Sequence, residues 1–108
     1  MTIRSGAAVD LTPPAGTVMI DGGAKATSSP KVTLSLAASD TGGAGIRDMM
    51  ISNTADFKGA VWEPFGATTS WSLQGGAAGL RTVFVKYRDE AMPGNESPVA
   101  TAEIRYEP

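Results

Sequence analysis

Cysteine and histidine are both absent from the 108 residues of this chain. Without cysteine, neither a disulfide nor a thiolate metal site can form. Without histidine as well, the chain cannot build a Ser-His-Asp triad, a cysteine nucleophile or an ordinary zinc site. The two absences exclude the commonest kinds of enzyme active site. We therefore expect a protein that is not an enzyme.

Clusters of one charge and long apolar runs are also missing. Nine basic and eleven acidic residues are spread along the chain and give a net charge of -2. Because no run of Lys and Arg marks a surface for polyanions, we expect no nucleic-acid partner. No stretch is long and apolar enough to cross a bilayer, so we expect no membrane insertion. The first residues lack the apolar core of a signal peptide, which leaves two expectations: a domain of a longer exported protein, or a protein assembled inside a cell.

Short strand-like stretches separated by Gly, Pro and Asp turns make up most of the chain, and no helical period occurs. Residues 31–38 show the pattern best, because Val32, Leu34 and Leu36 alternate with polar or small residues. Six further stretches have similar β character: 17–20, 46–53, 62–65, 69–73, 80–88 and 99–106. A chain of this length has space for one core only. The pattern predicts an all-β, seven-stranded immunoglobulin-like β-sandwich over residues 15–108.

The same alternation predicts which side chains form the core. These are Val18, Ile20, Val32, Leu34, Leu36, Met49, Ile51, Trp71, Leu73, Val83, Val85, Tyr87 and Ile104. Ahead of them, Pro13 and Pro14 favour an extended conformation and disfavour a helix start. We therefore expect residues 1–14 to form a flexible N-terminal arm or linker.

Four segments, taken in their order along the chain, carry a resemblance to a known family. They are Asp10-Leu-Thr-Pro-Pro14, Ser39-Asp-Thr-Gly-Gly-Ala-Gly-Ile46, Trp62-Glu-Pro-Phe65, and Thr82-Val-Phe-Val-Lys-Tyr-Arg-Asp89 followed by Gly94-Asn-Glu-Ser97. The set resembles the bacterial Ig-like, fibronectin-III-like repeats of surface proteins, adhesins and multidomain glycoside hydrolases. The chain departs from that pattern at residues 90–93, which look like an insertion.

The resemblance implies a non-catalytic structural or interaction module that is displayed on a large assembly. That assembly would be an extracellular bacterial surface protein, or a phage virion on which a free-standing copy serves as a capsid decoration or tail component. The protein partners would be neighbouring repeats in the first case and capsid or tail proteins in the second. The alternative is a carbohydrate-binding accessory domain of an exported glycoside hydrolase or adhesin.

Three aromatic residues are the candidate binding residues. Trp62 and Trp71 could stack on the apolar faces of sugar rings, or they could simply pack in the core or seal its edge. Phe84 falls on the face of its strand opposite Val83 and Val85, and an exposed Phe on a sheet can mark a protein contact.

Three loop residues are the candidate metal ligands. Asp40, Asp89 and Asn95 offer hard oxygen atoms that suit calcium, and we expect no other cofactor. If the strands before Asp40 and Asp89 run in the same direction, both residues lie at one end of the sandwich. The spacing of an EF-hand loop is missing, however, and Asp and Asn are also common turn formers.

Overall fold

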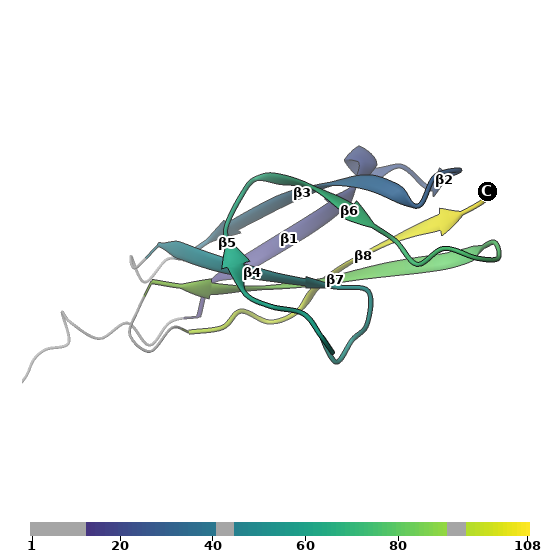
Figure 1. Ribbon diagram of the computed structural model, residues 1–108. Helices are drawn as coiled ribbons and strands as arrows, with labels where there is room; N and C mark the ends of the chain where they lie inside the picture. The colour runs from purple at the N-terminus through teal and green to yellow at the C-terminus, as the bar shows by residue number, and fades with distance from the viewer. Residues whose placement is uncertain (1–12, 41–44, 91–94) are drawn as a thin grey trace, which may run out of the picture.

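The computed structural model describes residues 13–40, 45–90 and 95–108, which form two facing β-sheets (Figure 1). Within these ranges there are eight strands and no α-helix. The smaller sheet has the order β1 (Ala15–Ile20), β3 (Lys31–Ser39), β6 (Thr68–Ser72). The larger sheet has the order β2 (Ala26–Thr27), β8 (Ala100–Tyr106), β7 (Gly79–Asp89), β4 (Ile46–Ser52), β5 (Glu63–Pro64). The predicted all-β sandwich is therefore confirmed.

Each predicted strand stretch coincides with one observed strand, and the predicted and observed ends differ by at most two residues. The predicted number of seven is one too low, because β2 was not foreseen. This two-residue strand pairs in parallel with the end of β8, Ala26 opposite Arg105 and Thr27 opposite Tyr106. A contact with a segment far along the chain creates β2, so the local sequence carries no signal for it.

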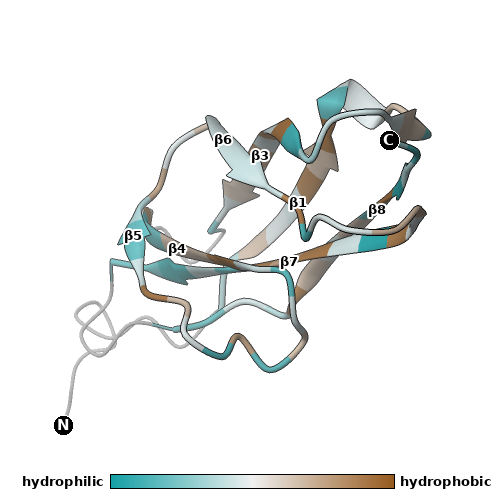
Figure 2. Ribbon diagram, turned by 45° about the vertical axis from the view of Figure 1, so that its right-hand side comes forward, coloured by the Kyte–Doolittle hydropathy of each residue, from teal (hydrophilic) through white to brown (hydrophobic). Residues whose placement is uncertain are grey.

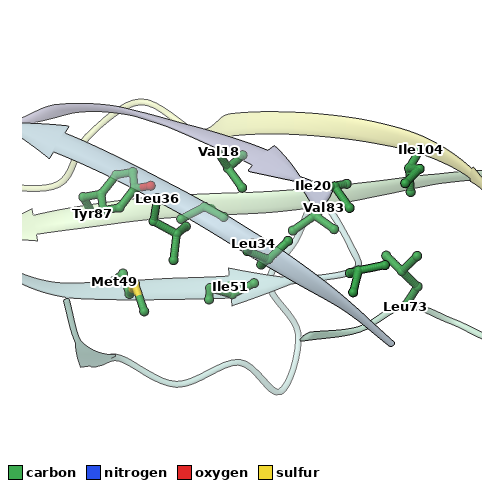
Figure 3. Packing of buried hydrophobic residues seen from close by; sticks show 12 residues of the cluster. Val18, Ile20, Leu34, Leu36, Met49, Ile51, Leu73, Val83, Tyr87 and Ile104 are labelled. Carbon is green, nitrogen blue, oxygen red and sulfur yellow. The ribbon is translucent and has the colours of Figure 1, made fainter. Parts of the chain in front are cut away.

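The core lies between the two sheets and follows the predicted alternation. All the predicted core residues are buried except Trp71, which is half-buried and packs against the cluster. Figure 3 shows side chains from both sheets meeting, with Leu34 of β3 near Val83 of β7 and Leu36 of β3 near Tyr87 of β7. The alternation is visible along β1 and β7 in Figure 2 as brown bands between paler or teal ones. Phe57 and Tyr106 are also buried.

Tyr87 of β7 joins the two sheets. Its side chain has no exposed surface, and its hydroxyl donates a 2.6 Å hydrogen bond to the carbonyl oxygen of Thr17 in β1. The ring lies so close to Gly16 that a Cβ there would stand 2.3 Å from the Tyr87 Cε2 atom. Phe65 contacts the same ring edge-to-face at 5.9 Å. Glycine is therefore required at position 16, because any side chain would occupy the space of the ring.

The first and last strands of the sandwich run in the same direction. β1 begins at one end, where Ala15 pairs with Ser39, and β8 finishes at the other end, where Tyr106 pairs with Gly79 (Figure 1). Pro14, which the sequence analysis assigned to the arm, is fully buried. The remainder of that arm, residues 1–12, lies outside the described residues.

We expect Gly16→Ala to destabilise the protein, because the new methyl group overlaps both the Tyr87 ring and the Ala37 carbonyl oxygen. Overpacking of this kind costs roughly 1–3 kcal/mol of unfolding free energy. Urea denaturation measures the change. Gly75→Ala is the matched control, because nothing lies within 4 Å of a Cβ at that position. Equal stability of the two variants would show that Tyr87 does not press against β1 in solution.

We expect a fall in stability at high pH that depends on Tyr87. Burial raises the pKa of its phenol from 10.0 to about 12. The unfolded chain therefore loses this proton near pH 10 while the folded chain keeps it, so the contribution to stability is complete below pH 10 and disappears as the pH approaches 12. Tyr87→Phe should lack this component of the decline. Urea unfolding of both proteins between pH 8 and about pH 12 tests the prediction, and parallel declines would contradict it.

Candidate interaction face

The outer face of the larger sheet gathers aromatic and cationic side chains. Alternation along β7 places Lys86 and Arg88 on the side away from the core. The Lys86 Nζ atom lies 4.9 Å from the centroid of the Phe57 ring and 5.6 Å from that of Trp62. The Arg88 Cζ atom lies 4.3 Å above the Trp62 ring. Together, Phe57, Trp62, Lys86 and Arg88 form what we term the cation–aromatic cluster.

The loop between β4 and β5 is folded so that Phe57 reaches this cluster. The Asp56 carboxylate accepts hydrogen bonds from the Thr54 hydroxyl at 2.8 Å and from the Lys58 N–H at 3.0 Å, and both bonds lower its pKa. Phe57 has a φ of 55°, which is unusual for a residue with a bulky side chain. Its side chain is nevertheless buried, so packing against the sheet offsets the backbone strain.

Each cation of the cluster already has an acidic partner. Arg88 donates to Asp48 Oδ2 from Nη2 at 2.5 Å and from Nε at 3.1 Å. This interaction, more than any other, holds the pKa of the Asp48 carboxyl below its usual range. Lys86 lies 3.3 Å from a carboxylate oxygen of Glu96. Because both charges are paired, the cluster attracts a polyanion only weakly.

The three candidate aromatic residues do not form one platform. Trp62 and Phe84 are both half-buried; Trp62 belongs to the cation–aromatic cluster, and Phe84 lies on the outer face of β7 opposite Ser52. Trp71 instead packs against the core, and its indole N–H donates a 2.9 Å hydrogen bond to the Asn53 side chain. Trp71 therefore joins β6 to the loop after β4.

Phe84 also lines a shallow depression near the start of β7. Its other lining residues are Asn53, Thr54, Ala55, Gln74, Leu80, Arg81 and Thr82. Leu80 is 55% exposed, which is high for a large apolar side chain. Leu80 was not among the predicted binding residues, although its even position on β7, out of phase with Val83 and Val85, places it on the outer face.

Arg81 organises one wall of the depression. Its guanidinium donates to the carbonyl oxygens of Gln74 at 2.8 Å, Gly75 at 3.2 Å and Ala77 at 2.7 Å. The same group stacks over the Tyr106 ring at 5.1 Å. The loop between β6 and β7 is therefore tied to β7 by a charge whose hydrogen bonds are largely used within the protein.

The candidate calcium ligands lie at the far end of the sandwich. β3 and β7 both end there, so Asp40 and Asp89 are placed at one end as the sequence analysis expected (Figure 1). Asp89 is completely buried, and its two carboxylate oxygens accept hydrogen bonds from the backbone and side-chain nitrogens of Asn95, at 2.8 and 2.9 Å. In the part of the chain that the structure describes, no three acidic side chains gather to hold a metal ion. Calcium binding stays a prediction.

Comparison with known proteins finds no relative of this chain. No protein-family model matches it, and neither does any curated protein or solved structure. Within the described ranges, no helix is long and apolar enough to cross a membrane.

Proposed function

We propose that the chain is an Ig-like, fibronectin-III-like module with a structural or interaction role in a large assembly, and without catalytic activity. The strand orders support this fold. In an immunoglobulin-like domain the last strand pairs with the one before it, which pairs with the third main strand, while the first two main strands lie in the opposite sheet. The orders β8-β7-β4 and β1-β3-β6 follow the same plan.

The observation that carries the proposed role is the placement of the first and last strands. β1 starts at one end of the sandwich and β8 finishes at the opposite end (Figure 1). Domains built in this way can be joined end to end, so that each one adds length to a rod or spaces a neighbour from a surface. A bacterial surface protein and a phage capsid or tail component would both use the module in this manner.

The coding sequence around residues 1–108 tests the role and separates its two settings. Further strand-rich repeats in the same reading frame would make the chain one domain of a surface protein. Neighbouring genes for capsid and tail proteins would make it a virion component. A frame that joins it to a catalytic domain, with no other repeats, would favour the carbohydrate-binding alternative.

Carbohydrate binding remains the second candidate, because Trp62 and Phe84 are both half-buried residues of the outer region of the larger sheet. Against it, one face of the Trp62 ring is covered by Arg88 at 4.3 Å, and Trp71 is engaged with Asn53. A sugar that stacks on indole requires an open ring face.

We expect tryptophan fluorescence to stay unchanged when soluble oligosaccharides are added at millimolar concentration. The chain has two tryptophans, so Trp62→Phe and Trp71→Phe each leave a single reporter. A saturable change that disappears in the Trp62→Phe variant, and persists in the Trp71→Phe variant, would establish the carbohydrate-binding function in place of the structural one.

A further inference from the structure

β7 extends past the end of its neighbour β4. The register pairs residues 84–89 of β7 with β4, whereas residues 79–83 pair only with β8 on the other side. Figure 1 shows β7 continuing beyond the point where β4 ends and its loop turns away. In the part of the chain that the structure describes, no strand lies along this edge of residues 79–83.

The hydrogen-bond pattern shows which backbone groups face the empty side. The Arg105 N–H donates to the Lys25 carbonyl, so the polar backbone groups of Arg105 point away from β7. In an antiparallel pair, the residue opposite must then point its own groups away as well. Leu80 is opposite Arg105, and Thr82, two residues on, repeats the same orientation. Their N–H and C=O groups therefore face the side that β4 leaves open.

The other end of β7 supports this assignment. Tyr87 exchanges hydrogen bonds with Ser97 on the β8 side, through the Tyr87 carbonyl at 2.8 Å and its N–H at 2.9 Å. The Glu90 N–H instead donates to the Gly45 carbonyl, which precedes β4. The backbone N–H and C=O groups of odd-numbered β7 residues thus point toward β8, and those of even-numbered residues point toward the β4 side. Among the described residues, the backbone groups of this free edge accept one long hydrogen bond, which Arg81 Nη1 donates to the Leu80 carbonyl oxygen at 3.4 Å.

The free edge opens into the depression described above. Leu80 and Phe84 flank Thr82 on the outer face, so an apolar surface borders the unpaired backbone. The side chains around it are already engaged: Asn53 bonds Trp71 and the Ser72 carbonyl, and Arg81 bonds the loop carbonyls. The groups of the depression that lack strand partners are therefore the backbone N–H and C=O groups of Leu80 and Thr82. The charged side chain of the depression is already paired within the protein, so an ionic ligand is not favoured.

We propose that this edge binds an extended peptide segment of a partner protein, which adds as a strand beside Leu80–Thr82 in line with β4 and antiparallel to β7. Main-chain hydrogen bonds to Leu80 and Thr82 supply affinity, as in other cases of strand addition. An apolar side chain opposite Thr82 lies diagonally between Leu80 and Phe84 and supplies selectivity. This peptide would be the partner of the interaction module, so the inference rests on the proposed function.

Several other stretches of sheet edge are protected, although among the described residues the outer side of β1 also pairs with no strand. β5 is two residues long and contains Pro64, which cannot donate to a ladder. The end of β8 is covered by β2, and Ser72 at the end of β6 is bonded by the Asn53 side chain. Natural sheets commonly protect their edges in these ways. Residues 79–83 of β7 have no such protection, and they border the depression that Leu80 and Phe84 line.

Selection of binders from a library of random dodecapeptides, followed by amide NMR mapping, tests the proposal. We expect selected peptides to share an apolar position between β-prone neighbours and to shift the amide signals of Leu80, Thr82 and Phe84. Thr82→Pro should weaken their binding at least tenfold, because it removes a donor from the edge. Thr82→Val keeps the donor and should bind as the native chain does.

The Thr82→Pro variant should remain folded, because the N–H of the native Thr82 takes no part in the ladder with β8. Its circular dichroism and melting transition check this. Should it not fold, Leu80→Asp provides a second variant at an exposed side chain, and it should weaken binding several-fold by placing a charge beside the apolar position.

Three results would overturn the docking edge: no enriched peptide, equal binding to Thr82→Pro, or amide shifts confined to β6 and its loops. Each would leave the proposed module role intact, since that role is judged by the coding context. Conversely, peptide binding at β7 together with a saturable fluorescence response to sugars would retain the docking edge and contradict the proposed structural role.

Discussion

The hydrogen bond from the Tyr87 hydroxyl to the Thr17 carbonyl connects the two sheets. It can form only because Gly16 leaves the space that the Tyr87 ring occupies. The backbone of Tyr87 is held in turn by Ser97, whose hydroxyl and N–H bond the same residue. One buried phenol thus sets the distance between the sheets, the path of β1 and the position of the segment that leads into β8.

β7 combines the stabilising and the exposed features of the molecule. Its odd-numbered residues fill the core, while Lys86 and Arg88 build the cation–aromatic cluster on the opposite face. Where β4 ends, the same strand presents unpaired backbone between Leu80 and Phe84. A long central strand next to a shorter neighbour is therefore both the rigid support of the fold and the place where it opens to a partner.

Alternating hydrophobicity predicted the core well because residues on a strand point to opposite faces in turn, whatever the strand pairs with. The exceptions have tertiary causes. Phe57 lies in a loop and has no period to reveal it, yet the fold of that loop buries it beneath Lys86. Trp71 is on the predicted face, but it sits on an edge strand and stays half-buried. β2 exists only through its pairing with β8.

The sequence by itself determined the all-β class, the inward side chains and the outward position of Phe84, because period-2 alternation is a local property of the chain. Only the tertiary structure decided that Trp62 is covered by Arg88, that Trp71 bonds Asn53, and that Asp89 closes on Asn95. The free edge at Leu80 and Thr82 also belongs to the tertiary structure. It depends on the relative lengths and register of strands distant in the chain, which no single stretch of sequence encodes.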